Sequence, residues 1–283
     1  MNTKKNLINL IFWITMAILF NVFIYYIRGE TAAIEYFGGY IVEMSLSLDN
    51  LFLFIIVFSK LGIREEYQER VLLYGVAGAM ILRLIFILLG VSIVNRFHFV
   101  LPLFGLILIY SGLAVFKNKQ ENKEFHNNFL VKVLKNIIPV TDMTYGQSFF
   151  VRRDKIFYAT PLFVALLIIE GSDVIFAIDS IPAIFSITTD TFIVYTSNIF
   201  AILGLRSMYY VLSKINNKFR FVKYGVGGIL IFTGIKLAAL IIKIEISVTN
   251  SVLIILCILL SSILLSIIFN DLHTNKNKSY LKK

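Results

Sequence analysis

Five carboxylates lie inside stretches of the chain that are otherwise apolar. Glu43 and Asp49 fall in one stretch, and Glu170, Asp173 and Asp179 fall in a second. A charge near the centre of a bilayer costs roughly 2.5–3.5 kcal/mol on insertion scales, so these acids need partners, water or protons. Desolvation and mutual repulsion favour the protonated form of a carboxyl group, so such acids can exchange protons for a bound cation. The pattern predicts a cation path.

Neutral oxygen donors accompany these acids. Asn50 and Asn198 supply amides, and Ser47 and Ser180 supply hydroxyls. Such donors suit Mn²⁺, Mg²⁺ or Ca²⁺, whereas Zn²⁺ and Cu²⁺ sites prefer His or Cys. The three His residues fall in loops or at a span boundary, and the single Cys, Cys257, lies in an apolar run. The donor set therefore favours a hard divalent cation as substrate.

The spacing of the acids leaves two arrangements open. Glu43 and Asp49 are six residues apart, as are Asp173 and Asp179. On a straight helix, that spacing separates two side chains by about 120° and about 9 Å, so one ion cannot easily touch both. Either the helices break near Gly171 or Pro182, or the acids form a ladder across the membrane. Both arrangements describe a cation path.

The elements that hold these residues are predicted to be membrane helices. The 283 residues are 58% hydrophobic and 16% charged, with a mean hydropathy of +0.82, which excludes a soluble enzyme of ordinary build. The chain is predicted to be a single all-α, polytopic transmembrane domain over residues 1–283. Its eight apolar stretches are about as long as a bilayer core requires. They cover residues 7–27, 36–59, 71–94, 98–116, 160–185, 191–213, 222–242 and 248–270.

Lys and Arg residues predict the orientation of these spans. With the N-terminus inside, 21 of the 27 Lys and Arg residues fall in segments on the inner side and only three in outer loops. Positively charged loops stay in the cytoplasm, so both termini are predicted to be cytoplasmic. The formal charge of +10 is then an orientation signal, and nucleic acid is not expected as a partner. The largest cytoplasmic loop is predicted over 117–159.

An internal repeat divides the spans. The segment Asn95–Gly112 recurs as Asn217–Gly234 with its Asn, aromatic, Gly and hydroxyl residues in the same order. Glu43 matches Asp173 and Asp49 matches Asp179 at an offset of 130 residues. The three-helix repeats, 36–116 and 160–242, would lie in opposite orientations because each has an odd number of spans. Inverted repeats are typical of secondary transporters. One further helix flanks the repeats at each end.

Three basic residues lie within predicted spans. Arg83 and Arg206 occupy matching positions in the two repeats, and they are predicted to neutralise nearby acids rather than to contact the substrate directly. Lys236 and Glu170 each lack a charged counterpart in the first repeat, so they are predicted to pair with each other.

Several motifs resemble the TerC family of integral membrane proteins, most of all its Alx-type bacterial branch. The similarity covers about residues 15–270, and the motifs that carry it are Glu43–Asn50, Tyr74–Ala79 followed by Arg83, Glu170–Ala183 and Thr196–Tyr209. One difference is that Alx-type members usually have another N-terminal span, whereas this chain starts just before what would be their second.

The resemblance implies a transporter of the LysE-related superfamily, associated with manganese export and, by name, with tellurium resistance. The family's site residues would fall on Glu43, Asp49, Asn50, Glu170, Asp173 and Asp179. We therefore expect Mn²⁺ export across the bacterial inner membrane, coupled to protons, with no catalytic activity and no permanently bound cofactor. The lipid bilayer and the cation are the expected partners, and the oligomeric state stays open.

Two other functions are weighed against export. A non-transporting membrane factor could help to metallate or insert partner proteins through its basic loop. An intramembrane aspartyl protease would use Asp49 and Asp179, but neither Asp lies in a Gly-x-Gly-Asp sequence.

Overall fold

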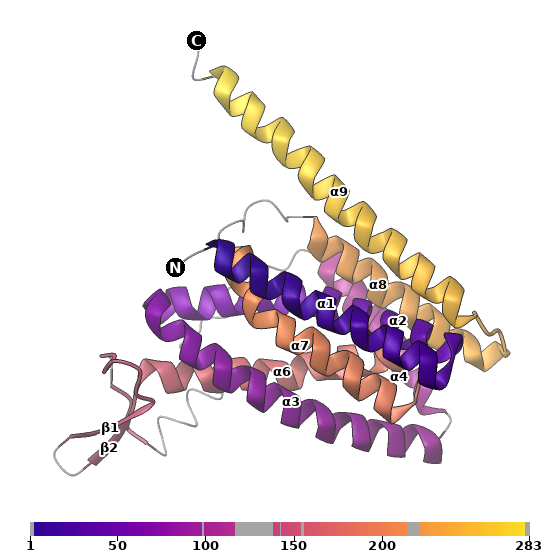
Figure 1. Cartoon of the computed structure of the whole chain (residues 1–283), viewed down its shortest axis with the longest axis horizontal. Coiled ribbons are helices and arrows are strands. Elements are labelled where there is room, and N and C mark those ends of the chain that lie inside the picture. The colour runs from indigo at the N-terminus through magenta and orange to yellow at the C-terminus, as the bar shows by residue number, and fades with distance from the viewer. Residues whose placement is uncertain are drawn as a thin grey trace.

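The described residues form eight α-helices, which are arranged in an elongated bundle in a computed structural model (Figure 1). It describes residues 3–97, 99–116, 138–141, 143–153, 156–213 and 221–280, with side chains at all of these except 3, 4, 49, 52 and 269–280. The helices are α1 (Thr3–Arg28), α2 (Glu30–Lys60), α3 (Glu65–Arg96), α4 (Val100–Phe116), α6 (Pro161–Phe185), α7 (Thr191–Ser213), α8 (Val222–Ala238) and α9 (Val248–Tyr280). A 3-10 turn, η3 (Ala239–Ile242), continues α8.

The helices confirm the predicted all-α, polytopic membrane architecture. Seven of the described helical segments are long and apolar enough to cross a membrane, and all eight predicted spans coincide with a helix. The exception in length is α4, whose 17 residues extend about 25 Å, slightly less than a bilayer core of about 30 Å. The helices mostly extend beyond the predicted spans, because their polar ends continue the helix past the apolar core.

The two helices that carry the acids are continuous. α2 runs unbroken through residues 43–50, and α6 runs unbroken through residues 170–180. Pro182 lies inside α6, near its end, but does not interrupt it. The spacing left two arrangements open, a break in each helix or a ladder of acids on unbroken helices. The helices are unbroken, so successive acids project in different directions.

The segment between α4 and α6 was predicted as a loop, and part of it instead forms a small hairpin. Strand β1 (Phe150–Arg153) pairs antiparallel with β2 (Ile156–Ala159). Residues 117–137 of the predicted loop lie outside the described residues. The hairpin, the start of α1 and the end of α9 lie toward the same end of the bundle (Figure 1), as an even number of spans requires.

Helices α4 and α8 cross at glycines from the two repeats. An added Cβ at Gly105 would lie 2.6 Å from the carbonyl oxygen of Gly234, and one at Gly234 would lie 2.6 Å from that of Gly105. Gly112 and Gly227 meet in the same way further along. Glycine permits this close approach of two backbones. Since Gly105 matches Gly227 and Gly112 matches Gly234, these are the contacts that a two-fold relation between the repeats would produce.

Two large apolar clusters lie in the interior. One joins α2, α3, α6 and α7 around Phe58, Leu72 and Leu162, and the other joins α2, α3, α4, α6 and α8 around Ile87, Leu108 and Ile184. Buried polar residues accompany these clusters in the interior, and we call them the polar layer. They include most of the predicted site residues, among them Glu43, Asn50, Arg83 and Asp173.

Candidate functional site

The first part of the polar layer is a buried ion pair. Arg83 of α3 donates from Nη1 to Oε2 of Glu43 on α2 at 2.6 Å, and to Oδ1 of Asn198 on α7 at 2.8 Å. The Ser47 hydroxyl donates to Oε1 of Glu43 at 3.1 Å. Glu43 is fully buried and Arg83 nearly so. Three helices thus share one charge pair, and Arg83 has the neutralising role that the sequence predicts.

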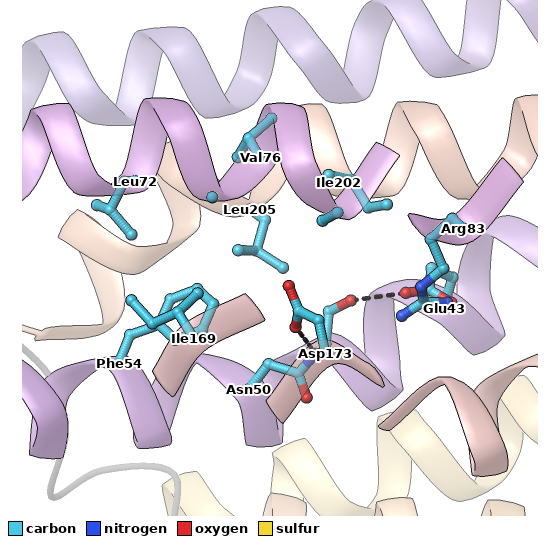
Figure 2. Close-up of a pocket in the computed structure, with 13 residues that line it drawn as sticks. Glu43, Asn50, Phe54, Leu72, Val76, Arg83, Ile169, Asp173, Ile202 and Leu205 are labelled. Carbon is cyan, nitrogen blue, oxygen red and sulfur yellow. Dashed lines mark hydrogen bonds and ion pairs between the residues drawn. The ribbon is translucent and has the colours of Figure 1, made fainter. Parts of the chain in front are cut away.

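Asp173 of α6 lies on the other side of a small cavity. Nδ2 of Asn50 donates to Oδ1 of Asp173 at 3.4 Å, and both residues are buried. Figure 2 shows Asp173 facing Asn50, with Glu43 and Arg83 together at one end of the cavity. This first cavity also borders apolar residues of α2, α3, α6 and α7. The cavity has a volume of about 20 Å³, which is room for about one water molecule.

A second and larger cavity lies beside Asp179. The Ser111 hydroxyl of α4 donates to Oδ1 of Asp179 at 2.8 Å. Ser180 and Asn50 also line this cavity, which has a volume of about 150 Å³. Among the described residues, Ser180 Oγ and Asn50 Oδ1 are buried without a hydrogen-bond partner.

The two cavities meet at the same pair of residues. Asn50 and Arg83 line both of them. Acids from the two predicted repeats, Glu43 and Asp173, border the first cavity, and Asp179 borders the second. The arrangement is a line of carboxylates and neutral oxygens through the middle of the bundle, with one amide and one guanidinium between the two spaces.

Glu170 and Lys236 do not pair, so that prediction is wrong. The carboxylate of Glu170 packs on Gly78 of α3 and interacts electrostatically with Asp173. Lys236 of α8 interacts with Glu35 of α2 instead. The error arose because Glu35 falls just outside the predicted span 36–59, whereas α2 begins at Glu30 and carries Glu35 into the bundle.

Arg206 also has a different surrounding from Arg83. It forms an ion pair with Glu69 of α3, and both side chains are partly exposed. Arg206 therefore lies away from the buried acids that it was predicted to neutralise. Its match with Arg83 in sequence is not a match in environment.

The predicted metal ligands are only partly gathered. Within the described ranges, no group of three or more His, Cys, Asp or Glu side chains is close enough to hold a metal ion. The Asp49 side chain lies outside the described residues. Asn50, Ser47 and Asn198 join the first cavity or its ion pair, and Ser180 joins the second.

Sequence reasoning missed two residues of the polar layer. Ser111 lies in a segment with no acid, yet it holds Asp179. A signal was present, because Ser111 is the hydroxyl residue that matches Thr233 in the repeat. Glu35 has no such signal in the sequence, since its partner is about 200 residues away along the chain and only helix packing joins them.

Comparisons with known proteins place these features in a family. The model of the "Integral membrane protein TerC family" matches residues 28–277. An "Uncharacterized membrane protein" of Rickettsia bellii is 42% identical over 237 residues, which cover 84% of this chain and 78% of that protein. The Escherichia coli protein named "Putative membrane-bound redox modulator Alx" is 41% identical over 233 residues, 80% of this chain and 73% of its own. No solved structure matches the chain.

Proposed function

The chain belongs to the TerC family of bacterial integral membrane proteins, and on this basis we propose that it exports Mn²⁺ from the cytoplasm. The observation that carries the proposal is the pair of internal cavities that meet at Asn50 and Arg83. Buried Glu43 and Asp173 border the first cavity and half-buried Asp179 borders the second, although carboxylates are costly inside a membrane and mark ion pathways there.

The donors around the first cavity suit a hard divalent cation. Carboxylates of Glu43 and Asp173, the Asn50 amide and the Ser47 hydroxyl all present oxygen atoms. Oxygen ligands are preferred by Mn²⁺ and Mg²⁺. No thiol or imidazole borders this cavity among the described residues. The same donors do not discriminate between Mn²⁺ and Mg²⁺, and Mn²⁺ is proposed from the family resemblance.

Arg83 acts in this proposal as a tethered substitute for the metal ion. In the present state its guanidinium neutralises Glu43, so this carboxylate is electrically satisfied without a cation. An arriving cation would compete with Arg83 for Glu43 and would also bind Asp173, which accepts a hydrogen bond from the neutral Asn50 amide. Return of protons to the carboxylates would then release the metal, which is the proton coupling that the sequence predicts.

Cellular manganese is the measurement that tests export. We would express the protein in a bacterial strain that lacks its own manganese exporters and measure cell manganese by mass spectrometry under manganese stress. Wild-type protein should lower cell manganese, and Asp173→Asn should not. Glu69→Gln is the matched control, because it also removes one carboxylate but lies outside both cavities.

Equal cell manganese with wild-type protein and Asp173→Asn, at equal protein levels in the membrane, would refute export. Such a result would favour a non-transporting factor that acts on partner proteins. That function would depend on exposed basic residues such as Arg152 of the hairpin, so Arg152→Ala would then be the damaging change.

Two functions suggested by names receive less support from the site. A tellurium oxyanion would need free cationic groups, but Arg83 is buried against Glu43 and Arg206 is paired with Glu69. A redox role through a disulfide within this chain would need two cysteines, and its 283 residues contain only Cys257.

A further inference from the structure

The second cavity holds oxygen atoms that the proposed export site does not use. Asn50 is 4% exposed and Ser180 is 2% exposed, and an oxygen of each has no hydrogen-bond partner among the described residues. A buried polar atom without a partner costs about 1–3 kcal/mol, so such atoms call for a water or a ligand. Two of them border one cavity, next to the carboxylate of Asp179.

The Asn50 amide is oriented by the first cavity. Its nitrogen donates to Asp173, and Figure 2 shows the amide oxygen turned away from Asp173. The Ser111 hydroxyl donates its proton to Asp179, so its own lone pairs remain available. Every one of these neutral groups can therefore offer an oxygen lone pair to a cation.

Charge decides which cation fits the cavity. Asp179 supplies one negative charge, and the positive charge of Arg83 is already balanced by Glu43 at 2.6 Å. Counted with Glu43, the ion-pair partner of Arg83, the described residues that line the second cavity carry one net negative charge, together with several neutral oxygens. One carboxylate borders this cavity, whereas two border the first, so a monovalent cation balances the charge here and a divalent cation would leave an excess positive charge in a low-dielectric environment. A proton on Asp179 would leave the Asn50 and Ser180 oxygens without a partner.

We propose that the second cavity is a sodium site, with Asp179 as its charged ligand. Coupling of this sodium ion to export rests on the proposed function. Sodium would replace the proton predicted for Asp179 only, while Glu43 and Asp173 keep the protons that release the metal. The site itself does not rest on export, because binding can be measured without transport.

Binding of radioactive sodium to the purified full-length protein in detergent micelles tests the site. Wild-type protein should bind sodium saturably, and Asp179→Asn should abolish the binding. Ser180→Ala should weaken the affinity about tenfold or more, the usual effect of losing one group that supports a bound metal ion.

Thr233→Val is the matched control. Thr233 corresponds to Ser111 in the repeat, but its hydroxyl donates to the carbonyls of Ile229 and Leu230 in its own helix. The Thr233→Val protein should therefore bind sodium with wild-type affinity.

Two results would overturn the sodium site: no saturable binding to folded wild-type protein at mildly acidic or alkaline pH, or equal losses for Ser180→Ala and Thr233→Val. A protein that binds sodium as expected but does not lower cell manganese would refute the export function and leave the sodium site standing.

Discussion

The two predicted repeats place matching residues in unlike surroundings. Arg83 of the first repeat is buried against Glu43, whereas Arg206 of the second is partly exposed against Glu69. Glu43 has a cationic partner at 2.6 Å, whereas its match Asp173 has a hydrogen bond from a neutral amide. An inverted-repeat transporter held in one state is expected to show such asymmetry, since the two repeats exchange roles when access alternates.

The repeats therefore differ in what holds their acids. The first repeat holds Glu43 in an ion pair, whereas neutral groups hold the acids of the second repeat. The ion pair of the first repeat joins α2, α3 and α7, so it stabilises the bundle as well as bordering the cavity. Asp173 and Asp179 are held by Asn50 and Ser111, which contribute no charge of their own. The carboxylates of the second repeat are therefore the ones best able to receive a cation.

The largest expected effect comes from removing Arg83. Arg83→Leu leaves Glu43 buried without its counter-ion, and breaking a buried ion pair typically costs about 3–5 kcal/mol of unfolding free energy. Thermal unfolding of the purified protein in micelles would measure the loss. The double change Arg83→Leu with Glu43→Leu should recover most of it, and failure to recover would mean that Arg83 stabilises the fold by some other contact.

The α4–α8 crossing is where the repeats should behave alike. Gly112→Ala places a Cβ 2.7 Å from a carbonyl oxygen, and its match Gly234→Ala places one at 2.6 Å, so each should destabilise the protein by about 1–3 kcal/mol. Gly204→Ala is the control, because its Cβ would meet Met44 at an ordinary 3.8 Å. Clearly unequal losses for Gly112→Ala and Gly234→Ala would break the two-fold relation inferred from these contacts.

The third prediction concerns the pair that sequence reasoning assigned wrongly. Lys236→Glu replaces the attraction between residue 236 and Glu35 with repulsion and leaves an acid at a buried position, so it should cost about 1–3 kcal/mol. Glu35→Lys in the same protein should restore stability, and Glu170→Lys should not. Protein level in the membrane and thermal unfolding would both report the result, and rescue by Glu170→Lys would contradict the structure.

The smallest expected effect is at the exposed ion pair. Arg206→Gln should change the unfolding free energy by about 0–1 kcal/mol, since exposed ion pairs are screened by solvent. The same thermal unfolding measurement applies. A loss as large as that of Arg83→Leu would show that Arg206 spends much of its time in a buried position, and it would remove the contrast between the repeats.

Most of the fold was predictable because the bilayer restricts the choices. A run of about 20 apolar residues can satisfy its backbone in lipid only as a helix, so predicted spans such as 191–213 and 160–185 agree closely with α7 and α6. The hairpin Phe150–Ala159 was not predicted, since a polar segment outside the membrane carries no such constraint.

The site was predictable as a set of residues and not as a set of contacts. Asp173 and Asp179 stand out in the sequence because charge is costly in apolar surroundings. Their partners Asn50 and Ser111 could not be assigned, because the rotation and tilt of each helix come from packing against its neighbours. The electrostatic interaction of Lys236 with Glu35 was missed because Glu35 falls just outside the predicted span 36–59 and meets α8 only through helix packing.

The sequence by itself determined that this chain is a polytopic membrane protein, which helices carry acids, and that matching residues recur in two segments. Each of these follows from local composition and from the order of residues along the chain. Only the tertiary structure decided that Arg83 neutralises Glu43 while Arg206 does not reach Asp173, and that two cavities meet at Asn50. Those facts depend on which faces of distant helices meet, and that is set by the packing of the whole bundle.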